Sequence, residues 1–345
     1  MILIVSNSRN EPSTDAVIDW LTHFGAKYIR INTDDLTVKD KATSVSIPDQ
    51  DVLKIGGVEI SVNDINIVWY RRWYDYSDIP FRTPTANERK LFREVINESD
   101  SIMYYLCGRL KDKPWLSNPL ITRFHNKQNT LYAAVKNGLR IPDTIITTQR
   151  SELKKFIEKN GEAITKPIGD PSMYIDKEGN GFKSYTQVIT ADMADNLPEQ
   201  FYLSQFQQKI NAAYEIRTFY LDGQFFSTAI MGSITTDIKL SVRIAHATKF
   251  VAFKLPSVIE ARLDRTMRDV NLNSASIDIM RGTDGQYYFL EANPVGQFSG
   301  YGAPCNYFLD KRIAEYLVRH DNVSKPSSYD KEKKIVYPNA MGQLV

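Results

Sequence analysis

The chain has 345 residues, 42% of them hydrophobic and 24% charged, which is typical of a globular protein with two or three sub-domains. Its 43 basic and 41 acidic residues give a formal net charge of +2, which disfavours a nucleic-acid-binding role. Two distant cysteines favour a reducing compartment over a disulfide scaffold. No run reaches the ~18 apolar residues of a membrane span, and the N-terminus lacks the features of a signal peptide. We therefore expect a soluble, cytoplasmic protein with no membrane partner.

The first elements in chain order predict a β-α-β unit. Met1–Val5 is a short apolar run that suits a buried parallel strand. Apolar residues then recur at i, i+3, i+4 and i+7 from Val17, and Gly25 stands where a helix end requires a positive φ. Tyr28–Ile31 is a second strand candidate. Because parallel strands need such a crossover, we expect an N-terminal α/β domain over residues 1–118.

Helices dominate the stretch that follows a further strand, INIVWY. The helical patterns cover residues 86–109, 126–137 and 151–160. Ser151 is the expected N-cap of the third helix. Together with short strands around glycines, these patterns predict a small central α+β domain over residues 119–202.

The chain becomes strand-rich from Phe201 onward. Asp-Gly dipeptides at 222–223 and 284–285 are typical of hairpin turns. We expect an antiparallel-sheet domain over residues 203–322. The polar stretch over residues 323–345 predicts a flexible tail.

The second hairpin, IDIMRGTDGQYYFLEANPVGQF, predicts a metal site. Strand side chains alternate between faces, so Glu291 and Asn293 point the same way. If Asp284-Gly285 is a two-residue turn, Asp278 lies directly opposite Glu291, and a four-residue loop still leaves it on that face. Three oxygen ligands of this kind suit Mg²⁺. The alternative is a solvated sheet face with scattered acids, which the apolar neighbours of Glu291 disfavour.

The sequence contains no Walker loop and no GxGxxG after a strand. If ATP binds, lysines must hold its phosphates from elsewhere. Lys127 begins a predicted helix, where the helix dipole also favours phosphate, and Lys166 ends a predicted strand. Each lysine taken singly is more often a solvated surface residue, so neither identifies a nucleotide site alone.

Five segments in order resemble ATP-grasp ligases. HNKQNTLYAAVKNGLRIPDT and EAITKP resemble the two lysine segments, YLSQFQQ the adenine hinge, and YEIRTFYLDGQ the strand with a ribose-binding acid and a substrate-facing arginine; the acidic hairpin follows. The resemblance implies that Arg217 is catalytic and that Asp278, Glu291 and Asn293 bind metal. The nucleotide contacts that it implies are Lys127, Lys166, Gln205, Phe206, Gln207, Glu215 and Lys239.

Other segments resemble the grasp-with-spasm peptide maturases, the graspetide synthetases related to the microviridin ester-forming enzymes. They are MILIVSNSRNEPSTDAVIDWL, IRINTDDL, VWYRRWYDY and EANPVGQFSGYGAPCNYFLDKRIAEYL, and the resemblance covers roughly residues 1–320. One departure is Asp237-Ile238-Lys239, where relatives tend to carry Asp-x-Arg. Lysine keeps the positive charge but lacks the planar guanidinium fork.

The resemblance implies an ATP-grasp fold with a pre-ATP-grasp N-terminal domain, a central domain that binds the leader peptide and closes over the nucleotide, and a C-terminal Mg-ATP site. It implies ATP and two Mg²⁺ as cofactors and a ribosomal precursor peptide, leader plus core, as substrate. A Glu or Asp side chain would be activated as an acyl phosphate and joined to a Thr or Ser hydroxyl or a Lys amine. A homodimer is expected from what relatives do.

Two alternatives remain at this point. The same site would serve a ligase that adds free amino acids, or a nucleotide-binding module without chemistry. The motif Tyr70-Arg71-Arg72-Trp73 has two interpretations: its arginines face acidic groups of the core peptide, or an arginine stacks on Trp73 or Trp69 at a domain seam. The four histidines show no metal spacing, and the sequence names no general base.

Overall fold

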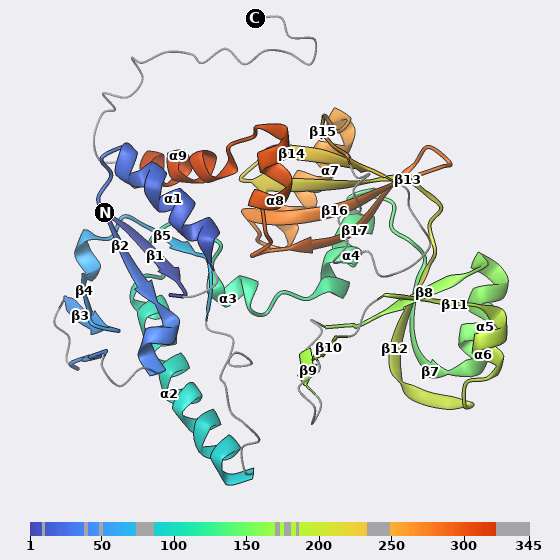
Figure 1. Ribbon diagram of the computed structural model, residues 1–345, viewed down its shortest axis with the longest axis horizontal. Helices are drawn as coiled ribbons and strands as arrows, with labels where there is room; N and C mark the ends of the chain where they lie inside the picture. Colours follow the sequence, from blue (N-terminus) through green and yellow to red (C-terminus); the bar gives the residue numbers. More distant parts are fainter. Residues whose placement is uncertain are drawn as a thin grey trace, which may run out of the picture.

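The computed structural model describes residues 1–8, 11–37, 41–47, 51–73, 86–169, 173–175, 181–183, 186–232 and 249–321. It comprises an N-terminal α/β part, a central α+β part and a C-terminal antiparallel sheet (Figure 1). The predicted fold class is therefore confirmed. In the described part of the chain, no helix is both long and apolar enough to cross a membrane. The predicted tail, residues 323–345, lies outside the described residues.

The N-terminal part is a parallel sheet of order β2-β1-β5-β6. Its strands are β1 (Ile2–Ser6), β2 (Tyr28–Asn32), β5 (Ile67–Tyr70) and β6 (Trp115–Leu116). Helix α1 (Pro12–His23) makes the crossover from β1 to β2, and Gly25 after it has a φ of 65°. The predicted β-α-β opening is confirmed. A small hairpin of β3 (Val52–Ile55) and β4 (Val58–Ser61), which sequence reasoning missed, packs beside this sheet.

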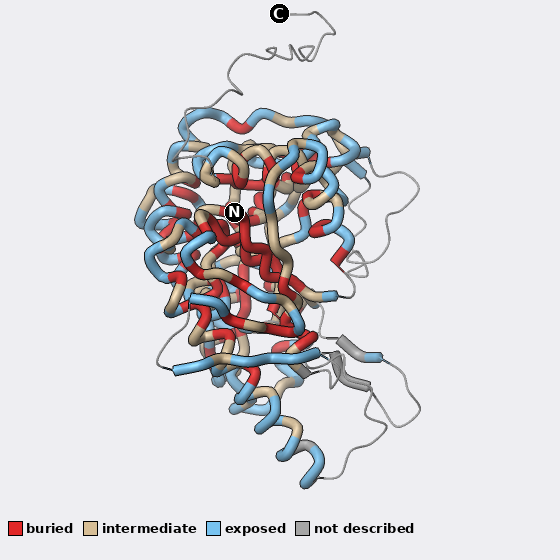
Figure 2. Tube along the Cα trace, turned by 90° about the vertical axis from the view of Figure 1, so that its left-hand side faces the viewer, coloured by how far each residue is buried: buried red, intermediate tan, exposed pale blue. Residues whose placement is uncertain are grey.

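Each face of the parallel sheet packs on its own helices. Ile2 and Ile4 face α1 and α9 (Leu309–Asp321), the last helix of the described chain. Leu3 and Val5 face the other way, toward α2 (Ala86–Arg109). Both faces are apolar because a parallel sheet is covered on both sides. The buried residues accordingly concentrate in the interior of the molecule (Figure 2). The N-terminal sheet and the C-terminal helix therefore share one core.

The central part is an antiparallel sheet of order β11-β8-β12-β7. Its strands are β7 (Thr144–Gln149), β8 (Ala163–Lys166), β11 (Gln187–Ile189) and β12 (Gln200–Gln208). Helices α5 (Arg150–Asn160) and α6 (Ala191–Asp195) pack on one face. A separate hairpin joins β9 (Met173–Ile175) and β10 (Gly181–Lys183). The last strand, β12, continues past residue 202, where the predicted central domain ends.

The predicted N-cap at Ser151 is wrong. Helix α5 begins at Arg150, and its N-cap is Gln149, whose side chain makes no capping hydrogen bond. Arg150 instead donates to the backbone oxygens of Asp195 and Leu197 and tethers α5 to the segment after α6. The N-cap thus lies two residues before the best local capping residue, next to a residue that makes a tertiary contact.

The C-terminal part is an antiparallel sheet of order β15-β14-β13-β16-β17. Its strands are β13 (Ala212–Leu221), β14 (Gln224–Met231), β15 (Lys249–Phe253), β16 (Ser274–Gly282) and β17 (Tyr287–Asn293). Helices α4 (Lys127–Lys136) and α7 (Ser257–Asp269) pack on one face, where Ile216 and Ile279 are buried. The neighbours Arg217 and Asp278 therefore point to the opposite face. The predicted turn at Asp222-Gly223 is confirmed, since Leu221 pairs with Gln224.

Several short elements complete the fold. They are the helices α3 (Pro119–Thr122) and α8 (Ser299–Gly302) and the 3-10 turns at Thr33–Thr37, Val62–Asp64 and Ala303–Cys305. Helix α8 follows β17, so the segment between them leads directly from the acidic hairpin to the shared core of the N-terminal sheet and α9 (Figure 1).

Candidate active site

The acidic hairpin places Asp278 opposite Glu291 across β16 and β17, as predicted. The turn differs from the prediction, however. Gly282 donates its amide hydrogen to the backbone oxygen of Gln286, so Thr283 does not pair with Gln286 and the turn is one residue longer. A register shift between Asp278 and Ile279 then restores the predicted pairing. The extra turn residue and the bulge cancel, so the facing pair was right although the predicted turn was wrong.

Asp278 is deeply buried, and its two carboxylate oxygens have different surroundings. Oδ2 forms an ion pair with Arg217, the neighbour of Asp278 across β13 and β16. Oδ1 is buried and has no hydrogen-bond partner among the described residues. Burial raises the pKa of Asp278 to about 7, with Arg217 opposing this and the nearby Glu291 adding to it. The carboxylate thus keeps one buried oxygen without a partner.

Glu291 connects the other predicted metal ligand to the lysines. Its Oε1 accepts a hydrogen bond from Nδ2 of Asn293 at 3.1 Å, and its Oε2 lies 3.5 Å from Nζ of Lys127. Burial lowers the pKa of Lys166; Lys127 lowers it further, while Glu291 and Asp278 oppose the shift. These charges act on one another, so the structure brings both predicted lysines to the acidic hairpin.

The predicted adenine hinge lies in β12, and its side chains have structural contacts. Gln205 accepts a hydrogen bond at 2.9 Å from Gln128, which follows Lys127 on α4. Phe206 is buried in the core of the central part. Gln207 is buried and donates to Thr144. Residues 205–207 pair with β7 on one side and with β8 on the other. Their adenine contacts remain predictions.

Of two further predicted nucleotide contacts, Glu215 and Lys239, the structure describes only Glu215. Glu215 lies on β13, two residues before Arg217 and on the same face, and its charge acts on both Arg217 and Asp278. Its ribose-binding role remains a prediction. Lys239, together with Asp237 and Ile238, lies outside the described residues.

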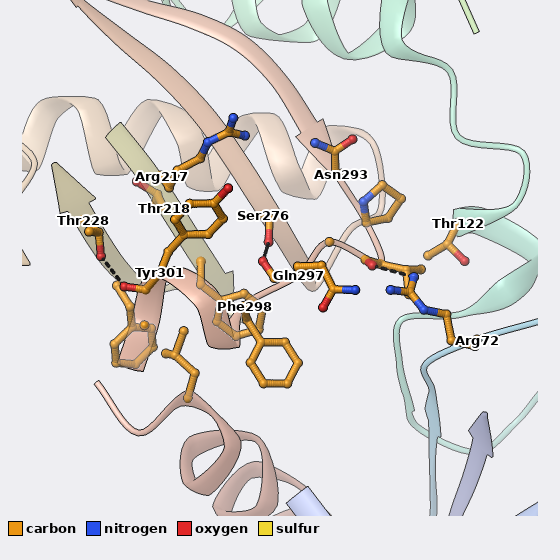
Figure 3. A pocket seen from close by; sticks show the side chains of 17 residues that line it. Arg72, Thr122, Arg217, Thr218, Thr228, Ser276, Asn293, Gln297, Phe298 and Tyr301 are labelled. Atoms are coloured by element: carbon orange, nitrogen blue, oxygen red, sulfur yellow. Dashed lines mark hydrogen bonds between the residues drawn. The ribbon is translucent and has the colours of Figure 1, made fainter. Parts of the chain in front are cut away.

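A cavity of about 440 Å³ opens beside the acidic hairpin (Figure 3). Arg217 and Asn293 belong both to its wall and to the cluster around the hairpin, so the cavity adjoins the predicted metal ligands. Tyr301 also lines it, and the guanidinium carbon of Arg217 lies 5.5 Å from the centre of the Tyr301 ring. The remaining wall is partly apolar and includes Phe226 and Phe298. The cavity thus combines the Arg217 guanidinium with a partly apolar wall.

The two arginines of the motif Tyr70-Arg71-Arg72-Trp73 lie in different environments. Arg71 is buried, donates to Glu11, and lies 5.1 Å from the ring of Phe298. It also donates to the backbone oxygens of Val295 and Gly296, which follow Asn293. Arg71 therefore joins the N-terminal part to the segment after the acidic hairpin. It lies at a domain seam as one interpretation held, but its aromatic neighbour is Phe298.

Arg72 lines the cavity as well as the seam. It forms an ion pair with Glu11 and donates to the backbone oxygen of Val295 at 3.0 Å. The Trp73 ring is covered by a different cation, Arg123, whose guanidinium carbon lies 4.2 Å from its centre.

The residues around the hairpin fit a hard divalent cation. Within the described ranges, no three His, Cys, Asp or Glu side chains form a group that could hold a metal by themselves. The set Asp278, Glu291 and Asn293 supplies two carboxylates and one amide oxygen, and Mg²⁺ commonly completes such a set with water and substrate phosphate. The unpartnered Oδ1 of Asp278 would then coordinate the cation, and the positive charge would offset the burial of the carboxylate.

Sequence reasoning missed several residues of this site. Tyr301, Gln128, Glu11 and Thr122 all contact predicted site residues or line the cavity. Gln128 adjoins Lys127, and Glu11 and Tyr301 lie in two of the segments that carry the family resemblance. Thr122 carried no signal, and only the folded chain shows which residues these four approach.

The chain matches known proteins in two of three comparisons. The family model of the MvdD pre-ATP-grasp domain matches residues 1–122. A comparison with curated protein sequences gave no match. Among solved structures, the macrocyclase MdnC from Microcystis aeruginosa MRC, bound with precursor peptide MdnA, superimposes with a TM-score of 0.77 at 25% identity, covering 92% of this chain and 99% of MdnC.

Two further structures have the same fold. A Chryseobacterium gregarium RiPP-associated ATP-grasp ligase, in complex with ADP and a leader and core peptide, has a TM-score of 0.73 at 22% identity, covering 94% of this chain and 97% of its own. The ATP-grasp ligase PsnB, complexed with minimal precursor, Mg and ADP, has a TM-score of 0.71 at 18% identity, covering 93% of this chain and 97% of its own.

Proposed function

We propose that this chain, which carries an MvdD-type pre-ATP-grasp domain and has the fold of ATP-grasp RiPP ligases, is an ATP-dependent peptide macrocyclase. Its substrate is a ribosomal precursor peptide with a leader and a core. It activates Glu or Asp side-chain carboxylates of the core and joins them to Thr or Ser hydroxyls, as esters, or to Lys amines, as amides.

One observation carries the proposal. The two carboxylates of the acidic hairpin, two lysines and Arg217 come together where the hairpin adjoins a cavity that could hold a peptide side chain. A nucleotide-binding module without chemistry has no need for a cavity with an arginine beside the metal ligands. The peptides bound to MdnC and to the Chryseobacterium gregarium ligase favour a peptide over a free amino acid.

The cofactors of the proposed enzyme are ATP and two Mg²⁺, and Asp278, Glu291 and Asn293 would hold the metal ions. Bound there, the metal ions would neutralise the charge that develops on the phosphate oxygens. Lys127 and Lys166 lie beside Glu291 and supply positive charge toward the phosphates. Lys239 and the hinge residues Gln205, Phe206 and Gln207, with Glu215 for the ribose, complete the proposed nucleotide contacts.

In the first step, a carboxylate oxygen of the peptide attacks the γ-phosphorus, the bond to the bridging oxygen breaks, and ADP leaves. Arg217 orients the carboxylate, because its guanidinium projects toward the cavity and can donate two parallel hydrogen bonds. The stacked Tyr301 ring limits the positions of that guanidinium. Holding the peptide carboxylate and the γ-phosphate in the reacting geometry lowers the entropy cost of the step.

In the second step, the hydroxyl or amine of the same peptide attacks the acyl carbon, and phosphate leaves with one of the original carboxylate oxygens. Arg217 stabilises the negative charge that develops on the acyl-phosphate oxygens. The proton of the attacking hydroxyl or amine leaves with the phosphate. The apolar part of the cavity wall, including Phe226 and Phe298, keeps water from the activated carbonyl.

The test incubates the chain with Mg-ATP and the short peptide encoded beside its gene and then measures the peptide mass. The expected result is the loss of one water per ring, with one ADP released for each. Mild alkali restores the original mass if the link is an ester and leaves an amide intact. No mass change, with ADP released on free glutamate instead, would contradict the proposal and support the ligase for free amino acids.

A pair of matched variants tests the metal site in the same assay. Glu291→Gln should abolish the mass change while circular dichroism stays unchanged, because the neutral amide lacks the negative charge with which the carboxylate binds the metal. Glu158→Gln, at an exposed position on α5, should behave like the unmodified chain. The expected homodimer is a separate prediction, which light scattering of the purified chain checks.

A further inference from the structure

The seam between the N-terminal part and the acidic hairpin contains more positive than negative charge. The Glu11 carboxylate is buried and forms ion pairs with both Arg71 and Arg72. Among the described residues, no other carboxylate forms an ion pair with either arginine. One negative charge thus serves two positive charges, and buried charges are costly unless they are paired.

The excess charge is accessible at Arg72. The Arg71 side chain is 4% exposed and its guanidinium hydrogens are used by Glu11, Ser13 and backbone oxygens. The Arg72 side chain is 28% exposed and lines the cavity. Its Nε binds Glu11 and its Nη1 binds the backbone oxygen of Val295, which fixes the guanidinium plane. In the described part of the chain, Nη2 has no hydrogen-bond partner.

A second donor without a partner lines the same cavity. The hydroxyl of Thr122, on α3, is buried and has no hydrogen-bond partner among the described residues. Thr122 and Arg72 line the same end of the cavity, and Asn293 lies between them and Arg217 (Figure 3). The described residues of the cavity wall include two arginines but no aspartate or glutamate. The cavity therefore offers two separate places for an anion.

We propose that Arg72 and Thr122 form a subsite for a second carboxylate of the peptide, so that the enzyme selects acceptor carboxylates with another acidic side chain nearby in the core. The inference rests on the proposed function and adds a specificity determinant to it. The nucleotide phosphates have their own cations, since Lys127 and Lys166 lie with Glu291. A carboxylate suits the new subsite because a guanidinium and a hydroxyl can donate one hydrogen bond to each of its oxygens.

The experiment is a cycle between enzyme and peptide variants. Each acidic residue of the precursor peptide is changed in turn to its amide, and kcat/KM is measured for the unmodified chain, Arg72→Gln and Thr122→Val. For one non-acceptor acid, the amide should lower kcat/KM about 10- to 100-fold with the unmodified chain, the loss expected for a hydrogen bond to a charged group. The same amide should have little further effect with Arg72→Gln, and Thr122→Val should weaken this coupling.

The controls separate the possible failures. A folding defect in Arg72→Gln lowers activity equally for every peptide, so a change that is equal for all of them overturns the inference. A raised KM for ATP without coupling to any peptide acid does so too and assigns Arg72 to phosphate. Arg268→Gln, at an exposed arginine on α7, should match the unmodified chain. If the unmodified chain cyclises no peptide, the proposed function itself fails, which is a different result.

Discussion

Replacing Asp278 by Asn should stabilise the metal-free chain at alkaline pH while removing its activity. The amide has nearly the same shape as the carboxylate but carries no charge, so it resembles the protonated acid. Burial raises the pKa of Asp278 from 3.8 to about 7, so the folded chain binds this proton more tightly than the unfolded chain does. The stability that the protonated acid provides is complete below pH 3.8 and is lost as the pH rises through about 7.

The magnitude follows from the same two pKa values. The difference between 3.8 and about 7, at about 1.4 kcal/mol for each pH unit, is on the order of 4 kcal/mol. Asp278→Asn should therefore raise the free energy of unfolding by up to about 4 kcal/mol at pH 8 and leave it nearly unchanged at pH 4. Such a gain is expected where a buried charged group is kept for function at the expense of stability.

The assay is urea unfolding without metal at pH 4 and pH 8, together with peptide-dependent ADP release. Activity should fall about a thousandfold or more, because a metal ion contributes several kcal/mol of charge stabilisation to the transition state. A variant that is less stable than the unmodified chain at pH 8, or one that releases ADP at a similar rate, would refute this reasoning.

Three further predictions concern neighbouring contacts. Burial alone would raise the pKa of Glu11, but Arg71, Ser13 and Arg72 together lower it. The stability that the ionised Glu11 contributes is therefore present above pH 4.5 and is lost as the pH falls through its folded pKa. Glu11→Gln should remove this part of acid unfolding, as followed by tryptophan fluorescence. Lys166→Gln should raise the KM for ATP about tenfold or more, whereas the exposed Lys155→Gln should leave it unchanged in an ADP-release assay. Gly296→Ala should lower the free energy of unfolding by about 1–3 kcal/mol, and with it the melting temperature, because the new methyl group would collide with the Ser276 side chain. It should also lower kcat/KM. A variant with the properties of the unmodified chain would contradict the packing at this turn.

The N-terminal opening and the main strands could be predicted from the sequence because their hydrophobic periodicity is local. The run Met1–Val5 predicted β1, and the helical pattern over residues 86–109 coincides with α2. The family resemblance added the order of the nucleotide segments, and the match to the MvdD model and the shared fold with MdnC confirm that resemblance. Local signals failed where a tertiary contact decided the outcome, as for the start of α5.

The candidate site was predictable where one strand pair contains it. Asp278, Glu291 and Asn293 lie on one hairpin, so alternation along a strand was enough to place them together. The partners from distant segments could not be found this way. Glu11 approaches Arg71 only because β1 and β5 pair in parallel and α1 crosses between β1 and β2. Long-range contacts of this kind leave no periodic pattern in the sequence.

The first proposed step is the phosphorylation of a peptide carboxylate at the acidic hairpin. Its most direct test labels the Glu and Asp side chains of the precursor peptide with ¹⁸O and measures the mass of the phosphate released with Mg-ATP. Because the acyl-phosphate oxygen leaves with the phosphorus, the account predicts one ¹⁸O atom in the phosphate for each ring closed. Unlabelled phosphate released together with cyclised peptide would contradict it.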